Sequence, residues 1–184
     1  DGAVTWLVEE RHAEVLAGNP LIREIVPYSR DGVSELSARF FDIAVNLDKE
    51  VEALDVVMKI KASKKFGFGR LDNGKLCPLD SLSEYAHRLG IDDDLKFFQN
   101  QKTYQEISFE QAGLVFGGEE YLFDLREGDI AFARSYLKSL GVDAGSAKRT
   151  IIGLNTGSGR RFAGKRLPVQ TFAELARMFG EQMS

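Results

Sequence analysis

The sequence predicts an α/β fold in which a mainly parallel sheet is covered by helices on both faces. Three features of the chain support this prediction. Short apolar segments alternate with segments whose apolar residues recur every three or four positions. The apolar segments are nearly continuous, which is typical of strands buried on both faces of a parallel sheet. The connections between the segments are short, as in other folds that alternate strands with helices.

The first half of the chain contains four apolar runs bounded by polar or turn-forming residues, and each run predicts a strand. In order, these strands are Val4–Val8, Ile25–Tyr28, Asp42–Leu47 and Lys65–Phe68. Helices are expected between them. The first is short and contains Ala13 and Leu16, the second ends near Phe40, and the third covers residues 50–62 with an amphipathic spacing.

The second half of the chain gives fewer signals. Ser81 and Glu84 have the spacing of a capping box, which predicts a helix from there through Arg88. Between Asp92 and Glu120 the pattern is mixed and predicts no particular element. The other expected elements are helices at residues 129–140 and 169–179, a buried strand at Thr150–Leu154 and, as one interpretation, a strand at Tyr121–Leu125.

The composition excludes several classes of site. The formal net charge is −4, so the chain as a whole is not expected to bind nucleic acid through bulk electrostatics. Cys77 is the only cysteine and there are two histidines, which excludes an intrachain disulfide and an ordinary zinc site of nitrogen and sulfur ligands. We therefore expect no metal site and a reduced, cytoplasmic compartment.

Both ends of the chain suggest a fragment. The sequence enters a strand pattern directly after Asp1, and it stops at Ser184 inside or just after a helical pattern. The small and polar stretch Gly141–Arg149 is the candidate linker between two domains. The expected domains are therefore residues 1–145 and residues 146–184, the second being only the start of a domain.

The most informative loop follows the predicted strand at Thr150–Leu154. It contains several glycines, the hydroxyl side chains of Thr156 and Ser158, and four cations, and it leads into a helix opened by Pro168. Glycines let backbone N–H groups curl around an anion, hydroxyl groups add donors, and a helix start adds the positive end of a dipole. The loop therefore suits a phosphate or diphosphate group.

Two other interpretations of this loop stay open. Glycine-rich strand–helix loops are common, and the arginines could be ordinary solvated side chains. Gly159–Lys165 also fits the first seven positions of a P-loop. However, the eighth position is Arg166, where a P-loop has Ser or Thr to hold magnesium. Pro168 is better explained as the first residue of a helix that starts there.

The loop resembles the opening of the donor domain of the lipopolysaccharide heptosyltransferases, which are glycosyltransferases of family 9. The similar pattern is Ile-x-Leu-Asn-Thr-Gly-Ser-Gly at residues 152–159, followed by a basic spacer and Lys-x-x-Pro at residues 165–168. Leu167 stands where the family usually has tryptophan. Further similar segments follow the family's order along the chain: Asn19-Pro20, Phe41–Lys49, Phe66–Gly69, Tyr85 with Leu89-Gly90, and Asn100 with Thr103–Ile107.

The resemblance implies a GT-B fold, with twin Rossmann-like domains and mainly parallel sheets, here incomplete at both ends. It implies transfer of a heptose-type sugar from an ADP-sugar to a lipopolysaccharide core acceptor by inverting, direct displacement, without metal or cofactor. Thr156, Gly157, Ser158 and Lys165 occupy the motif positions that contact the donor diphosphate. Preorganised N–H, hydroxyl and ammonium groups would stabilise the charge of the leaving ADP.

The resemblance also implies an anionic, lipid-linked saccharide acceptor, and hence a place at the inner face of the inner membrane. The family holds this acceptor with cations at strand ends of the first domain. Lys49 is the first candidate and Arg70 the second, although either could be an ordinary surface cation. Asp48 is expected to cap the helix that follows it.

The family's catalytic aspartate and the first strand of its first domain would lie upstream of Asp1, and its nucleobase contacts beyond Ser184. This chain by itself is therefore expected to be inactive. The alternative to an enzyme of this family is a non-catalytic α/β module that binds a phosphate or nucleotide in the same loop without group transfer. A P-loop-like NTPase is a less favoured alternative.

Overall fold

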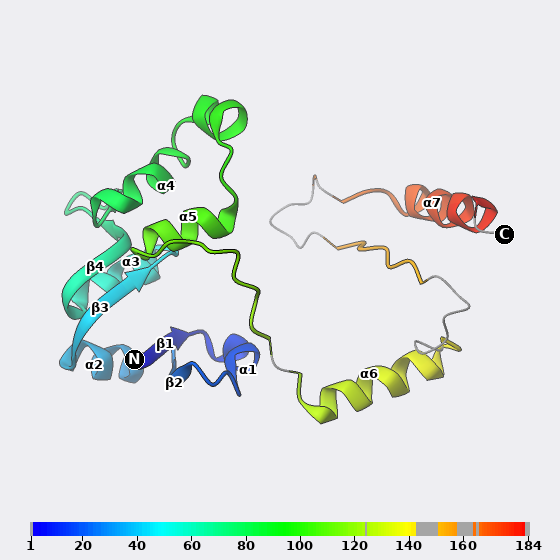
Figure 1. Cartoon of the computed structure of the whole chain (residues 1–184), viewed down its shortest axis with the longest axis horizontal. Coiled ribbons are helices and arrows are strands. Elements are labelled where there is room, and N and C mark those ends of the chain that lie inside the picture. The colour runs from blue at the N-terminus through cyan, green and yellow to red at the C-terminus, as the bar shows by residue number, and fades with distance from the viewer. Residues whose placement is uncertain (1, 124, 143–150, 158–163, 165, 183–184) are drawn as a thin grey trace. The chain divides into compact units, whose positions relative to one another are not determined.

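A computed structural model describes residues 2–123, 125–142, 151–157, 164 and 166–182 of the chain (Figure 1). The chain divides into two units, Asp1–Asp124 and Leu125–Ser184, and each is described by itself. The domain boundary that we predict at residues 145–146 lies outside the described residues and stays a prediction.

The first unit contains two small sheets. β1 (Val4–Val8) pairs with β2 (Ile22–Pro27), and β3 (Phe40–Asn46) pairs with β4 (Lys61–Arg70), in both cases in parallel. β5 (Leu76–Pro78) joins the other edge of β4 in antiparallel orientation. The predicted α/β class with mostly parallel strand pairs is thus confirmed, whereas the twin-domain GT-B arrangement stays a prediction.

The strands differ from the sequence prediction mainly in length. β1 has the predicted bounds, but β4 extends well beyond the predicted Lys65–Phe68 in both directions. Its first residues pair with β3 from Lys61 onward and include exposed lysines, so a search for apolar runs misses them. β5 was not predicted at all, because three residues carry too little periodicity to identify a strand.

Helices and single turns connect these strands. They are the 3-10 turn η1 (Glu10–His12), α1 (Ala13–Leu16), α2 (Arg30–Ala38), α3 (Val51–Lys59), the 3-10 turn η2 (Ser81–Ser83), α4 (Glu84–Arg88), the π-helical turn η3 (Leu95–Gln99) and α5 (Tyr104–Gln111). The amphipathic helix expected at residues 50–62 is therefore α3, and its buried residues are Leu54 and Val57.

The predicted capping box at Ser81 and Glu84 is wrong. Asp80 is the cap instead: its Oδ1 accepts hydrogen bonds from the backbone N–H groups of Leu82 and Ser83, at 2.7 and 3.2 Å. Its carboxylate reaches these groups because its backbone is extended, which is the geometry of a residue that precedes a helix.

A capping box occurs at the start of α5, within the stretch that gave no sequence prediction. The Thr103 side chain accepts a hydrogen bond from the backbone N–H of Glu106, and the Glu106 carboxylate accepts one from the backbone N–H of Thr103. The spacing of these two residues is the sequence signal that could have located this helix.

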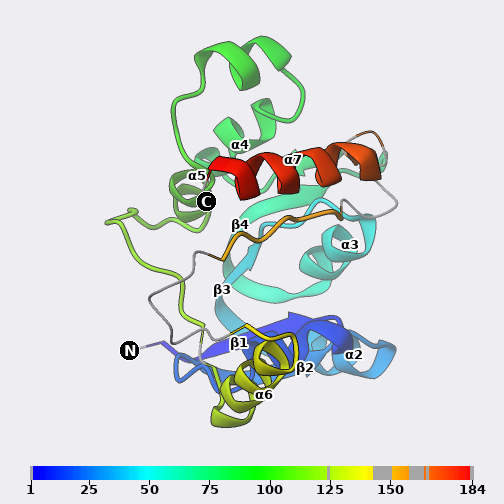
Figure 2. The same cartoon turned by 90° about the vertical axis from the view of Figure 1, so that its right-hand side faces the viewer.

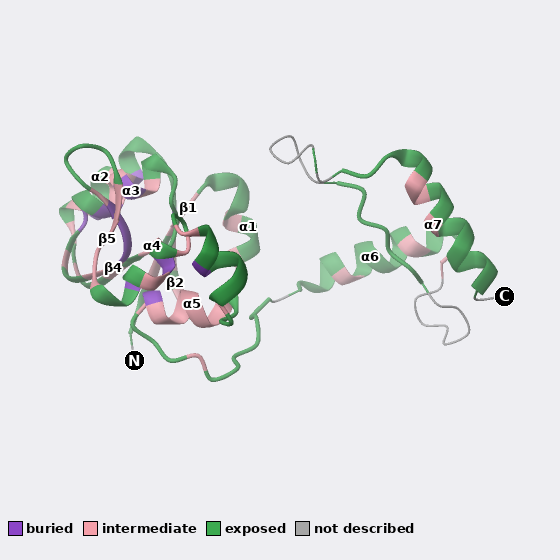
Figure 3. Ribbon diagram, turned by 90° about the horizontal axis from the view of Figure 1, so that it is seen from above, coloured by how far each residue is buried: buried purple, intermediate pink, exposed green. Residues whose placement is uncertain are grey.

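Two apolar clusters stabilise the first unit. One is built on Val26, Leu36 and Ile60, and residues of both sheets, including Leu7 and Phe41, pack against it. The other is built on Leu54, Phe68 and Ala86, and therefore joins α3, β4 and α4. In Figure 3 the segments coloured as buried all belong to the first unit.

The second unit consists of α6 (Glu127–Ser139) and α7 (Val169–Gln182), with no buried residue among those described. The strands predicted at Tyr121–Leu125 and Thr150–Leu154 are wrong for their described residues, which form no strand. Ile151 is 57% exposed. An apolar segment becomes a strand only when a neighbouring strand takes up its backbone hydrogen bonds, and the described residues supply no such neighbour here.

Both sheets of the first unit have unpaired edges among the described residues: β1 and β2 each have only one partner, and β3 is unpaired on the side away from β4. β1 pairs only with β2, and β3 pairs only with β4, so the two sheets remain separate (Figure 2). Trp6 on β1 and Ile43 on β3 are 46% and 53% exposed. The first strand that the resemblance implies upstream of Asp1 stays a prediction.

Gly67 is the point at which β4 changes partners. Asn46 of β3 is paired with Gly67, whereas the next residue, Phe68, is paired with Pro78 of β5. Gly67 has a φ of +91°, and a Cβ at this position would lie 1.9 Å from the backbone oxygen of Asn46. Glycine is therefore required here both by backbone conformation and by the lack of space.

We predict that Gly67→Ala lowers the free energy of unfolding by about 3 kcal/mol or more, because a steric clash adds to the cost of a positive φ. The matched control is Gly74→Ala. Gly74 has a similar φ of +84° but open space around it, so this variant should lose only about 1 kcal/mol. Urea unfolding of both variants measures the difference, and equal losses would contradict the role given to Gly67.

Candidate functional site

The carboxyl ends of β3 and β4 lie side by side and are joined by the side chain of Asn46. Its Nδ2 donates hydrogen bonds to the backbone oxygens of Phe68, at 2.8 Å, and of Asp48, at 3.0 Å. Its Oδ1 accepts a hydrogen bond from the backbone N–H of Asp48 at 3.2 Å. These bonds hold the turn after β3 against β4, at the edge where ligands bind in open parallel sheets.

Asp48 stabilises this turn and does not cap the following helix. Its Oδ1 accepts a hydrogen bond from the backbone N–H of Glu50 at 3.0 Å. Glu50 is itself the residue that precedes α3, and its side chain makes no capping bond. The predicted helix cap at Asp48 is therefore wrong, because Asp48 lies two residues before the N-cap position, too early in the chain for its carboxylate to cap the first free N–H groups of the helix.

Lys49 lies at this edge beside an aromatic ring. Its Nζ is 4.7 Å from the centroid of the Phe68 ring, and Phe68 is only 1% exposed. Burial of the ammonium group, and then the charge of Lys96, lowers the pKa of Lys49 below its ordinary value of 10.5. Within the described part of the chain, no carboxylate forms an ion pair with Lys49, so its positive charge is not neutralised there.

Arg70, the second predicted acceptor contact, has a structural partner. Its Nη2 lies 2.6 Å from Oδ1 of Asp55 on α3, and both side chains are about one-third exposed. The ion pair links the end of β4 to α3. No described contact brings Arg70 together with Lys49, so whether Arg70 also binds an acceptor stays a prediction.

The donor loop is described only in part. Thr156 and Gly157 are exposed, and the backbone N–H of Gly157 donates to Oδ1 of Asn155 at 3.0 Å. Ser158 and Lys165, the other two predicted diphosphate contacts, lie outside the described residues. The arrangement of these four residues around a diphosphate therefore stays a prediction.

The start of α7 follows the donor loop. The carbonyl of Pro168 accepts hydrogen bonds from the backbone N–H groups of Thr171 and Phe172, at 3.1 and 3.4 Å. The helix thus begins next to Pro168, as the sequence predicts. Residues 166–168 are not helical.

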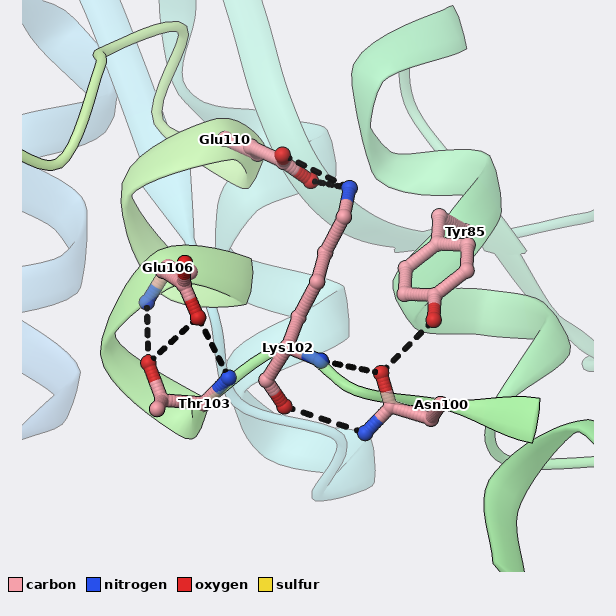
Figure 4. Close-up of polar contacts among 6 residues, drawn as sticks. All are labelled: Tyr85, Asn100, Lys102, Thr103, Glu106 and Glu110. Carbon is pink, nitrogen blue, oxygen red and sulfur yellow. Dashed lines mark hydrogen bonds and ion pairs between the residues drawn. The ribbon is translucent and has the colours of Figure 1, made fainter. Parts of the chain in front are cut away.

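A polar network that the sequence analysis missed joins α4 to α5 (Figure 4). Tyr85 Oη donates to Oδ1 of Asn100 at 2.6 Å, and Nδ2 of Asn100 donates to the backbone oxygen of Lys102 at 3.0 Å. Lys102 Nζ donates to both carboxylate oxygens of Glu110 at 2.7 Å and lies 4.5 Å from the centroid of the Tyr85 ring. Because Glu110 neutralises the charge of Lys102, this network is a structural link.

Two features of the described residues and one comparison with known proteins bear on the site. No group of three or more His, Cys, Asp or Glu residues in the described ranges is arranged to hold a metal ion. No described helix is long and apolar enough to cross a membrane. Comparison of the chain with protein-family models, curated proteins and solved structures finds no match. The resemblance to heptosyltransferases therefore rests on the sequence motifs.

We predict that Asn46→Asp lowers the free energy of unfolding by about 2 kcal/mol. The change keeps the size of the side chain but removes both donated hydrogen bonds and places a negative charge beside two carbonyl oxygens. Asn73→Asp is the matched control, because Asn73 only accepts a bond from the backbone N–H of Lys75 and is exposed. It should lose less than about 0.5 kcal/mol. Denaturant titrations that give the same loss for both variants would refute the role of Asn46.

Proposed function

We propose that this chain is part of a metal-independent glycosyltransferase of the GT-B type. The enzyme would move a heptose-type sugar from an ADP-sugar to an anionic, lipid-linked saccharide acceptor of the lipopolysaccharide core. The observation that best supports this proposal is the pairing of two features in one chain. The donor motif occupies residues 152–168, and Lys49 presents a charge without a described carboxylate partner at the carboxyl end of β3.

The proposed reaction is a single displacement with inversion. An acceptor hydroxyl oxygen forms a bond to the anomeric carbon of the sugar, the bond from that carbon to the diphosphate oxygen breaks, and ADP leaves with the bonding electrons. The hydroxyl proton passes to a base that, in this proposal, lies outside the chain. The residues assigned to the diphosphate are Thr156, Gly157, Ser158 and Lys165, whose donors and charge stabilise the leaving group.

On the acceptor side, Lys49 supplies the charge that attracts an anionic saccharide. Arg70 is the weaker candidate, because its guanidinium group is already bonded to Asp55. A lipid-linked acceptor places the enzyme in the cytoplasm, at the inner face of the inner membrane.

The P-loop alternative is disfavoured by the start of α7. A P-loop continues from its lysine directly into a helix whose first residues hold the phosphates and magnesium. Here residues 166–168 are not helical, and the helix begins with bonds to the carbonyl of Pro168. A non-catalytic α/β module that binds an anion in the same loop remains the second candidate, because Thr156 and Gly157, two of the residues assigned to the anion, are exposed.

We predict that Lys165→Ala in the complete transferase reduces kcat/KM for the ADP-sugar by about ten- to a hundredfold, because a charge-assisted bond to phosphate is lost. Arg166→Ala, the matched loss of a neighbouring charge, should change it by less than about threefold. Steady-state kinetics with the donor concentration varied would separate the two, with thermal melts to check folding.

Two outcomes would contradict the proposal in different ways. Equal, small effects of the two substitutions would mean that the diphosphate does not bind this loop. ADP binding that depends on Lys165, without any release of ADP when donor and acceptor are both supplied, would favour the non-catalytic module.

A further inference from the structure

Aromatic rings hold several cations of the first unit. A cation over the face of a ring is attracted by the negative charge of that face. In the described part of the chain, the cationic group lies between 4.5 and 5.2 Å from the ring centroid in four pairs. These pairs are Arg39 with Phe41, Lys49 with Phe68, Lys96 with Phe97, and Lys102 with Tyr85. The Lys49 pair, at the carboxyl end of β3, differs from the others in charge and in burial.

Carboxylates neutralise two of these four cations. Arg39 Nη1 lies 2.8 Å from Oε2 of Glu24, and Lys102 Nζ lies 2.7 Å from Oε1 of Glu110. The lysines of the other two pairs form no ion pair with a carboxylate within the residues that the structure describes. A carboxylate holds a cation by cancelling its charge, whereas an aromatic ring holds a cation and leaves the net charge unchanged. The charge of Lys49 is therefore left for an external anion.

The rings of these two remaining pairs differ in burial. Phe97 is 65% exposed, so its ring lies largely in solvent and gives the cation over it no fixed place. Phe68 is 1% exposed and belongs to the apolar cluster with Leu54 and Ala86. The backbone oxygen of Phe68 also accepts the hydrogen bond from Asn46 Nδ2 at 2.8 Å. The position of the Phe68 ring is therefore fixed by packing, and so is the place that it offers to the ammonium.

The backbone just after α4 also lies against the Lys49 ammonium. A Cβ on Gly90 would lie 3.2 Å from Lys49 Nζ and 3.2 Å from the backbone oxygen of His87. Both distances are shorter than most contacts of a Cβ, so a side chain at residue 90 would press on the ammonium. Ala86 of α4 packs beside Phe68. One helix thus supports the ring and leads to the glycine, and together these two residues determine where the ammonium lies.

We propose that Phe68 is a positioning residue for the acceptor. Its ring holds the Lys49 ammonium at the carboxyl end of β3 without neutralising it, so that an anionic group of the acceptor meets a charge already in place. An unrestrained lysine loses much of its rotamer freedom when it binds an anion, whereas a lysine that is held beforehand loses less. The role in acceptor binding rests on the proposed function, whereas the restraint of Lys49 by the ring does not.

The first test measures this restraint by NMR of the 184-residue chain. Protons over the face of an aromatic ring resonate upfield, so we expect the methylene signals next to Lys49 Nζ to lie upfield of those of an exposed lysine. Phe68→Leu should abolish this shift, while thermal melts show a folded protein. Phe97→Leu, the same substitution in the exposed pair, is the matched control and should leave the Lys49 signals unchanged. An absent shift, or one that survives Phe68→Leu, would overturn the inference.

The second test measures use of an anionic lipopolysaccharide core saccharide by the complete transferase, with the acceptor concentration varied. Phe68→Leu should raise KM for the acceptor by about threefold or more, and should change kcat and the donor KM by less than about twofold. Phe97→Leu should change all three by less than about twofold. In a Lys49→Gln background, Phe68→Leu should have no further effect on the acceptor KM, because the ring acts through Lys49. Equal effects in both backgrounds would mean that Phe68 serves only the apolar cluster.

Gly90→Ala is a second variant that leaves the cluster around Phe68 unchanged. It keeps the test decisive if Phe68→Leu does not fold. Because the added methyl group presses the ammonium away from its place, Gly90→Ala should raise the acceptor KM by about threefold or more and reduce the upfield shift of the Lys49 signals. No effect on either quantity would overturn the inference.

The outcomes separate this inference from the proposed function. An active transferase in which Lys49→Gln raises the acceptor KM, but neither Phe68→Leu nor Gly90→Ala does, would overturn this inference alone. The absence of sugar transfer, or an acceptor KM that is unchanged by Lys49→Gln, would contradict the proposed function on the acceptor side and overturn the role of Phe68 with it.

Discussion

The first unit depends on the backbone geometry of Gly67. At this residue β4 leaves its parallel partner β3 and begins to pair with β5. The N–H of Gly67 donates to Asp80 Oδ2 at 3.1 Å and to Oγ of Ser83 at 2.9 Å, and Ser83 is completely buried. One glycine thereby links the sheet to η2, the turn that leads into α4. Gly90 follows two residues after the end of α4. The link from Gly67 through η2 to α4 therefore also positions Gly90, which lies beside the Lys49 ammonium.

Several cations of the first unit differ in their partners. Lys102 and Arg70 form short ion pairs with carboxylates. Lys65 donates to the backbone oxygens of Val57 and Met58 at 2.8 and 3.1 Å, at the end of α3, where cations are favoured. These side chains stabilise the fold. Lys49 has an aromatic ring beside it and, among the described residues, no carboxylate in an ion pair with it, so its charge has no such structural role.

A site residue could be predicted from the sequence only where a pattern of neighbouring residues indicates its position in the fold. Lys49 was found because it directly follows an apolar strand, and ligands in parallel sheets bind at that end of a strand. For Arg70 the same strand-end rule gave a candidate, but the structure shows an ion pair with Asp55, a partner that no local pattern indicates.

The sequence by itself determined the α/β class, the bounds of β1 and the positions of α3 and α7, because apolar periodicity and turn residues act within a few residues. Only the tertiary structure decided the rest. The strand predicted at Thr150–Leu154 is absent among its described residues, since a strand needs hydrogen-bonding neighbours as well as an apolar sequence. The close approach of Gly67 to Asn46 and of Lys49 to the Phe68 ring likewise arise from residues distant in sequence. Such contacts exist only when the chain is folded.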